Sequence, residues 1–226
     1  MHSIDMYHGQ VPKTAPPAIR RALVERAAEM LTRREPVTLR ALVAGTGVST
    51  MAVYTHFGGM PGLWRAVRQE GFTRLAAELG SVRITHDPIR DLMSYGAAYM
   101  RNAFAHPDLY RAMFNAEFDL EDPKAAADTF AVLISCAARA KERGRLADQV
   151  DPEAVATRFW AFGHGLAMLV LNGILPRRAL DDHVTPMATA LLVAAGDEAE
   201  RCRRSVRAGS RAFDSGVRGG TVARNP

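Results

Sequence analysis

The pattern of apolar and polar positions along this 226-residue chain is that of α-helices. In several segments apolar residues recur every three or four positions, the spacing that places them on one face of a helix. Prolines and glycines stand between these segments, where helices begin and end. We find no strand pattern and no internal repeat. The spacing predicts two short helices between residues 38 and 57, another short one over 108–114, and longer ones over 17–33, 61–79, 88–104, 125–143, 152–172 and 181–203.

The two short helices are joined by a tight turn. Thr38 stands at an N-cap position before the first helix, and Gly45-Thr46-Gly47 ends that helix, because glycine accepts turn conformations at little steric cost. Ser49 is a second N-cap candidate. Val53 and Phe57 form the inner face of the second helix. Its outer face is short and uncharged and carries Thr50, Met51, Tyr54, Thr55 and His56.

This spacing is typical of a helix-turn-helix motif, which places its second helix in the major groove of DNA. An ordinary helical hairpin has the same spacing, so the pattern alone leaves both readings open. The net charge of +5 is unevenly distributed: residues 1–80 hold 10 Lys+Arg and 6 Asp+Glu, residues 81–196 hold 12 and 14, and residues 197–226 hold 7 and 4. A basic N-terminal part and a slightly acidic middle suit a DNA-binding head on a body that does not bind DNA.

Residues 18–72 resemble the N-terminal domain of the TetR/AcrR family of transcriptional regulators, and the run GVSTMAVYTHF from Gly47 is the most specific part of the match. The resemblance implies an all-α fold, in which a three-helix DNA-binding domain with a helix-turn-helix precedes a helical ligand-binding and dimerisation domain. It implies a homodimeric repressor with DNA contacts at Thr38, Ser49, Thr50, Met51, Tyr54, Thr55 and His56. Thr50, Met51 and Thr55 are the expected base contacts, whereas Thr38, Tyr54 and His56 are expected at phosphates.

Two positions depart from the family pattern. Ala52 stands where members usually have Thr or Ser, and Met60 stands where they usually have Lys. In the family both positions contact phosphates, so their loss weakens the electrostatic part of DNA binding. The alternative hypothesis is therefore a helical small-molecule sensor or interaction protein whose DNA-binding motif has degenerated.

The chain divides into four parts by composition and pattern. We expect a disordered arm over residues 1–16, a DNA-binding domain over 17–62, a ligand-binding and dimerisation domain over 63–205, and a basic disordered tail over 206–226. The two terminal parts are rich in Gly, Arg and small residues and poor in large apolar ones, a composition that does not support a packed core.

Aromatic and methionine side chains gather in the second half of the chain. Plain core packing explains any one of them, but as a set they predict a pocket for a small, largely apolar molecule. Candidate polar anchors are Tyr95, Tyr99, Asn102, Asn115 and His164. The expected pocket residues are Tyr95, Tyr99, Phe104, Tyr110, Met113, Phe114, Phe130, Phe159 and Trp160.

Residues 159–175 are almost uninterruptedly apolar. A helix of that length spans about 25 Å, less than a bilayer core, so we expect it to be buried between its own bundle and a second subunit. Trp160, His164-Gly165 and Asn172-Gly173 resemble a pattern in the ligand domains of one TetR subgroup. The family resemblance implies a four-helix dimer interface from the last two helices of each subunit, here with Gly163, Leu166, Leu169, Val170, Leu191 and Leu192.

Other kinds of site find no support. The chain has no nucleophile elbow, P-loop or GxGxxG, so we expect no enzyme and no cofactor. Its two cysteines form no CxxC or CxxH pair, and His86, His106 and His164 lack metal-ligand spacing, so we expect no metal. Few cysteines and no signal pattern favour the cytoplasm. The expected partners are operator DNA, a second copy of the chain and an unidentified small molecule, with no membrane.

Overall fold

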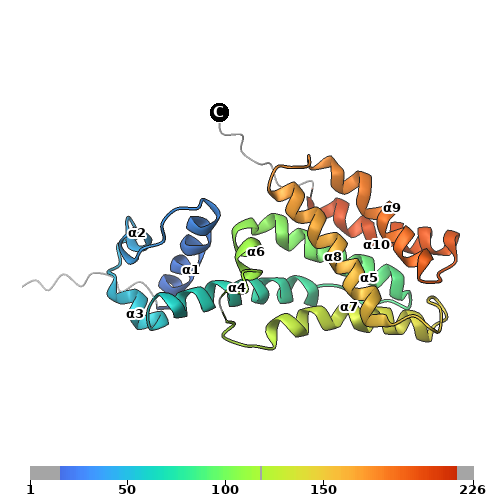
Figure 1. Cartoon of the computed structure of the whole chain (residues 1–226), viewed down its shortest axis with the longest axis horizontal. Coiled ribbons are helices and arrows are strands. Elements are labelled where there is room, and N and C mark those ends of the chain that lie inside the picture. The colour runs from blue at the N-terminus through green and yellow to red at the C-terminus, as the bar shows by residue number, and fades with distance from the viewer. Residues whose placement is uncertain (1–15, 118, 218–226) are drawn as a thin grey trace, which may run out of the picture.

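The computed structural model describes residues 16–117 and 119–217, and this part of the chain is all-α, as predicted. It contains ten helices and no strand (Figure 1). Their bounds are α1 Pro16–Thr32, α2 Leu39–Val43, α3 Met51–Phe57, α4 Met60–Gly80, α5 Pro88–Ala105, α6 Pro107–Met113, α7 Ala125–Glu142, α8 Pro152–Leu171, α9 Arg178–Ala194 and α10 Ala199–Val217.

Short polar side chains and prolines set the beginnings of several helices. The Asp87 carboxylate accepts hydrogen bonds from the backbone N–H groups of Ile89 and Arg90 and so caps α5. Asp151 caps α8 in the same way through the N–H of Glu153. α4, α5, α6 and α8 carry proline in the first turn, where the missing N–H costs no intrahelical bond. These signals explain why most helix starts agree with the sequence pattern.

The helices form a small head and a larger body (Figure 1). The head consists of α1, α2, α3 and the first half of α4, and the body contains the remaining helices. The domain boundary expected between residues 62 and 63 falls inside α4. Leu63, Ala66 and Val67, which follow that boundary, still pack in the head core. Leu109 and Ala112 of α6 also belong to that core. α4 and α6 therefore join the head to the body.

The body is a helical bundle around α5. α10 lies along α5 so closely that a Cβ atom on Gly209 would stand 2.5 Å from the carbonyl oxygen of Arg90. α7 and α8 cover another side of α5, and α9 packs against α8 and α10. The main core cluster of the protein runs through these helices and includes the second half of α4, with Phe72, Leu75 and Leu79.

The C-terminal segment differs from the prediction. Instead of one helix over 181–203 and a disordered tail from 206, the chain forms α9 and then α10, which continues to Val217. The break lies at Gly196, whose φ of 110° favours glycine, and at Asp197, whose buried carboxylate binds the Arg145 guanidinium at 2.7 and 2.8 Å. Residues 218–226 of the expected tail and 1–15 of the expected arm lie outside the described residues.

α8 is the most apolar helix of the described chain. By length and composition it could cross a membrane, and 28% of that stretch is buried within the protomer. α8 packs against α5, α7 and α9 in the body, and an apolar composition is also what a helix covered on two sides requires. One side of this helix remains uncovered.

Candidate functional site

The turn motif of the head has the predicted architecture, with one shift at the start of its second helix. The Thr38 hydroxyl accepts a hydrogen bond from the Ala41 N–H at 3.2 Å, which confirms Thr38 as the N-cap of α2. α3 begins at Met51, and Thr50 occupies the N-cap position expected for Ser49 without a side-chain capping bond. Val53 and Phe57 face the head core with 0% and 9% exposure.

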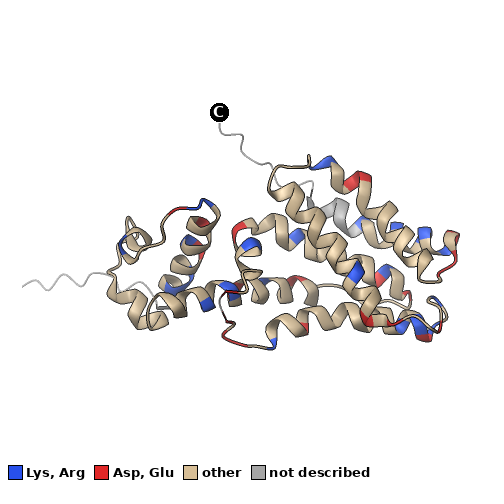
Figure 2. Cartoon of the chain, in the orientation of Figure 1, with Lys and Arg blue, Asp and Glu red and all other residues tan. Residues whose placement is uncertain are grey.

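The outer face of α3 is exposed and carries no formal charge (Figure 2). Met51 is 63% and Tyr54 50% exposed, unusually high values for large apolar side chains. Thr55 is also exposed, and its hydroxyl donates to the Met51 carbonyl at 2.9 Å, which leaves its oxygen lone pairs as acceptors. Thr50 and His56 are half-buried, and Ser49 is exposed. Of the predicted contact residues on α3, Met51, Tyr54 and Thr55 are thus exposed.

Glycines determine how α3 is mounted on α4. Gly58 and Gly59 have φ values of 70° and 118°, which other residues rarely adopt, and so allow the sharp turn between the helices. A Cβ atom on Gly62 would lie 1.7 Å from the carbonyl oxygen of Phe57, so only glycine fits there. The orientation of the exposed α3 face is therefore fixed by backbone contact with α4.

Both departures from the family pattern are partly buried. Ala52 and Met60 are half-buried and pack against the head core, so neither presents a polar group outward. Arg40 on α2 and Arg65 on α4 are exposed. They are among the exposed basic side chains of the head, with Arg21, Arg33 and Arg34.

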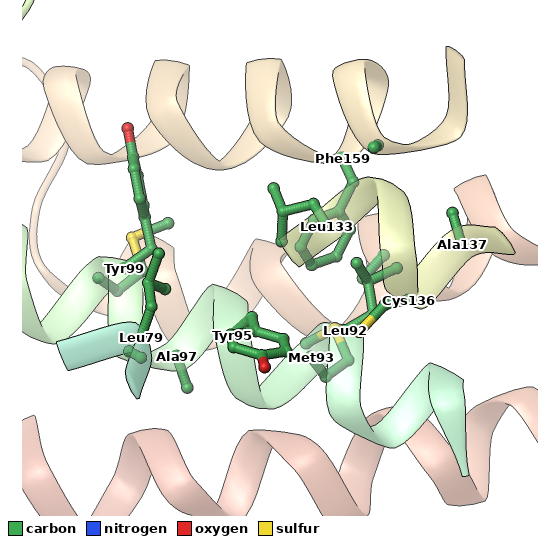
Figure 3. Packing of buried hydrophobic residues seen from close by; sticks show 14 of the residues in the cluster. Leu79, Leu92, Met93, Tyr95, Ala97, Tyr99, Leu133, Cys136, Ala137 and Phe159 are labelled. Carbon is green, nitrogen blue, oxygen red and sulfur yellow. The ribbon is translucent and has the colours of Figure 1, made fainter. Parts of the chain in front are cut away.

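The body encloses a cavity of about 830 Å³, lined by residues of α4, α5, α7, α8, α9 and α10 and by Phe114 after α6. Its size lies in the range of small-molecule sites. Figure 3 shows part of its wall, where Tyr95 and Tyr99 leave α5 in different directions and Leu133 of α7 approaches Phe159 of α8. Six of the nine predicted residues line it: Tyr95, Tyr99, Phe114, Phe130, Phe159 and Trp160.

The other three predicted pocket residues lie outside the lining. Phe104 instead stacks under the Arg177 guanidinium, 4.8 Å from the ring centroid. Tyr110 and Met113 are fully buried on α6, where Met113 packs against Gly71 of α4. The sequence reading also missed the contributions of α9 and α10, which supply Leu180, Val184, Ala188 and Ser210. The sequence reading assigned the helix that contains the α9 residues to the dimer interface, and Ser210 of α10 falls in the expected disordered tail.

Behind the cavity wall, three side chains form a hydrogen-bonded triangle that joins α5, α6 and α8. The Tyr99 and Tyr110 hydroxyls lie 2.8 Å apart, and they lie 2.9 and 2.8 Å from His164 Nδ1. Trp160 Nε1 donates to the Tyr99 hydroxyl at 3.3 Å. Burial raises the pKa of Tyr99 to about 12, raises the pKa of Tyr110 and lowers the pKa of His164, so all three groups are neutral near pH 7.

The polar anchors expected for the pocket therefore divide into three kinds. Tyr95 and Tyr99 line the cavity, and His164 acts on it only through Tyr99. Asn102 is 2% exposed and lies outside the lining, as does Asn115. The cavity surface is mostly apolar and aromatic, with few polar groups, as in many small-molecule sites.

The predicted dimer residues separate into buried and surface positions. Leu166 and Leu192 are 6% and 0% exposed within the protomer, and Gly163 lines the cavity. The expected pair of last helices also changes, because α10 follows α9 and packs on α5. Leu169 is 39% exposed, and Val170 and Leu191 are half-buried. Two exposed apolar side chains were missed: Ile174 (67%) and Met187 (49%).

Comparisons with known proteins agree with this architecture. Residues 92–209 match the family model described as "Tetracyclin repressor-like, C-terminal domain". An uncharacterised HTH-type transcriptional regulator of Mycobacterium tuberculosis is 27% identical over 184 residues, which cover 79% of this chain and 81% of that protein.

Two solved structures share the fold. One is a protein with unknown function from Rhodococcus sp. RHA1, with a TM-score of 0.66 and 23% identity over 86% of this chain and 100% of that one. The other is the TetR family protein CprB from S. coelicolor A3(2), with a TM-score of 0.66 and 20% identity over 87% and 98%. The family model spans more than half of the sequence, and the head and body stand in the matching order. The chain belongs to the TetR family of transcriptional regulators.

Proposed function

We propose that the protein is a homodimeric repressor that a small, largely apolar molecule releases from operator DNA. The observation that carries the proposal is the outer face of α3, where Met51 and Tyr54 are at least half exposed on a helix held rigidly by glycine contacts. Exposed large side chains on such a short helix contribute little to stability, so a binding role explains them better. A protein that binds chromosomal DNA in this way works in the cytoplasm.

Each subunit presents α3 to the major groove. Thr50, Met51 and Thr55 face the bases, and Met51 and the Thr55 methyl group suit apolar contacts with thymine methyl groups. Thr38, Tyr54 and His56 hold phosphates, which positions the helix but does not specify sequence. Two such heads require two half-sites about 34–36 Å apart or a multiple of that spacing, as in other helix-turn-helix dimers.

A second copy of the chain covers the uncovered side of α8 and α9. Leu169, Ile174 and Met187 are exposed there, next to half-buried Val170 and Leu191. Apolar side chains grouped on one surface are typical of subunit contacts. The family arrangement of two helices from each subunit supports the same pairing.

Ligand and operator compete through the shape of the body. The cavity wall reaches α6 through the Tyr99–Tyr110 hydrogen bond, and Leu109 and Ala112 of α6 pack in the head core. A ligand that binds better when α6 is displaced moves the heads away from their DNA spacing. By linkage, DNA then weakens ligand binding by the same factor.

A band-shift experiment with the DNA upstream of the protein's own gene tests the proposal. We expect one retarded species whose mass corresponds to a dimer on a near-palindromic site. A folded, dimeric protein that binds neither this DNA nor any sequence from a random pool would favour the second candidate, a sensor without DNA binding. The half-buried Ala52 and Met60, which offer no polar group to phosphates, are the observation that favours this candidate.

A further inference from the structure

A second, smaller cavity of about 430 Å³ lies between α4 and α7. It shares Phe72, Leu79, Tyr95 and Thr129 with the larger cavity, so the two spaces lie on either side of the same wall. The shared wall is mostly apolar, and Tyr95 carries its largest polar group.

Tyr95 places a hydroxyl group at this shared wall. It is 7% exposed and lines both cavities. Its hydroxyl has no hydrogen-bond partner among the described residues, in contrast to Tyr99, whose hydroxyl contacts Tyr110, His164 and Trp160. The Tyr95 hydroxyl is therefore available to a bound molecule.

The rim of the smaller cavity is acidic. Asp122 and Asp128 line it, and its lining contains no Lys or Arg. The loop with Asp122 is attached to α4, because the Asp122 N–H donates to Gln69 Oε1 at 2.9 Å. Asp128 lies exposed in the first turn of α7. Two carboxylates at this rim repel an anion and favour a cation.

The lining of the larger cavity does not favour an anion either. Its lining includes the exposed Asp181, and its one basic residue is Arg68. Arg68 Nε already donates to the Met113 carbonyl at 3.0 Å. The remaining surface is apolar and aromatic, including Phe72, Phe130 and Trp160.

We propose that the ligand is an amphiphile whose polar end is a hydrogen-bond donor that is neutral or positively charged. The polar end lies in the smaller cavity, donates to the Tyr95 hydroxyl oxygen and faces Asp128, while the apolar part extends into the larger cavity. The inference rests on the proposed function only in taking the larger cavity as the ligand site.

Three probes with the same ten-carbon chain test the charge preference: decylamine, which is protonated at pH 7, decan-1-ol and decanoate, all kept below micellar concentrations. The chain contains two tryptophans, Trp64 in the head and Trp160 in the cavity wall. In a Trp64→Phe background, Trp160 fluorescence therefore reports occupancy of the cavity without DNA. We expect decylamine to bind about three- to tenfold more tightly than decanoate, because exposed charges contribute modestly, with decanol between them.

Two variants separate the contributions of hydroxyl and charge. Tyr95→Phe should weaken decylamine and decanol about three- to tenfold, the effect of one hydrogen bond, and leave the fold intact because the hydroxyl binds nothing in the described protein. Asp128→Asn should bring the decylamine and decanoate affinities closer together and leave decanol unchanged. Glu142→Gln, an exposed acid at the far end of α7 that lines neither cavity, is the matched control and should change none of these affinities.

The outcomes are distinct from those of the DNA experiment. If decanoate binds more tightly than the other two probes, the inference is wrong, and the polar end of the ligand lies at Arg68 instead. Unchanged affinity of Tyr95→Phe for decylamine and decanol would overturn the assignment of the hydrogen bond. If none of the three probes changes the Trp160 fluorescence, the proposal of an amphiphilic ligand is wrong. None of these results depends on operator binding, which the band shift measures separately.

Discussion

The head and the body of this protein are both helical bundles, but they use their apolar side chains in opposite ways. In the head, the apolar side chains of α1, α2 and α4 fill a small core, and the functional face lies outside on α3. In the body, side chains from six helices, with aromatic ones on α4, α5, α7 and α8, surround a cavity of about 830 Å³. The head presents a rigid surface, whereas the body holds an internal volume that a ligand can fill.

Glycines make the same contrast at atomic scale. A Cβ atom on Gly62 in the head would stand 1.7 Å from a backbone oxygen, but one on Gly163 in the body would meet only the flexible end of Met100, at 3.6 Å. The joint between α3 and α4 therefore tolerates no added atom at Gly62, whereas the cavity wall accepts one at Gly163. Four substitutions test how far this difference extends.

Gly62→Ala should have the largest effect. The methyl group cannot fit against the Phe57 carbonyl, so α3 must move from α4, with a loss of about 3 kcal/mol or more in unfolding free energy and no measurable operator binding. Thermal unfolding followed by circular dichroism and a band shift check this. The control is Gly80→Ala on the same helix, where a Cβ would meet no atom within 4 Å, and a small gain of about 0.4–1 kcal/mol is expected. Equal melting of Gly62→Ala and the wild type would contradict the rigid joint.

Leu169→Glu tests the outer surface of the body. A charge buried without a partner between two subunits costs about 3 kcal/mol or more, which raises the dimer dissociation constant about 100-fold. Analytical ultracentrifugation at micromolar concentration should show about 24.6 kDa for the variant and twice that mass for the wild type. Ile84→Glu replaces an equally apolar side chain, 63% exposed before α5, and should leave the dimer unchanged. A monomeric wild-type protein would refute the interface.

Tyr54→Ala tests the outer surface of the head. Loss of the hydrogen bond from the Tyr54 hydroxyl to a phosphate in each half-site should weaken operator binding about 10- to 100-fold. The dimer and the affinity of the cavity for its probes should stay as in the wild type, because the ring is exposed on α3. Tyr54→Phe keeps the ring but removes the hydroxyl, so it separates the contribution of ring packing to operator affinity from that of the hydrogen bond. Unchanged operator affinity in a folded Tyr54→Ala protein would show that this face does not meet DNA.

Met60→Lys should have the smallest effect, and it should strengthen operator binding. Met60 is the first residue of α4 and half-buried, and a lysine stem can keep its apolar contact while the ammonium group reaches a phosphate. The slope of log K against log salt should steepen by about 0.9 per subunit, with tighter binding at low salt. Preference among operator variants should hardly change, because phosphate contacts carry no direct base information. A changed preference with an unaltered slope would place residue 60 away from the DNA backbone.

The sequence was most informative where function depends on neighbouring residues. Thr38, the glycine turn and the inward Val53 and Phe57 lie within twenty positions of one another, and the structure confirms the cap and the burial. The position of the α3 N-cap was wrong by one residue, because Ser49 and Thr50 are both favourable caps and the spacing does not choose between them.

The cavity depends on residues far apart in the chain, and there the sequence was less informative. Aromatic content identified six lining residues, but it could not show that Tyr110 of α6 contacts Tyr99 and His164 outside the lining, or that Leu166 and Leu192 face the protomer core. Periodicity does not say which neighbour covers a helix face. The turn at Gly196-Asp197 was visible as a glycine followed by an N-cap residue. Recognising it would have placed α10 in the body.

α4 couples the unfolding of the head to that of the body. Its first half contributes Leu63 and Val67 to one core, and its second half contributes Phe72 and Leu75 to the other, within one uninterrupted helix. Neither core can open without exposing apolar surface on the helix that supports both. Head and body are thus a single cooperative unit, and a fragment ending at Gly80 would lack the Leu109 side chain that closes the head core and would lose stability as a result.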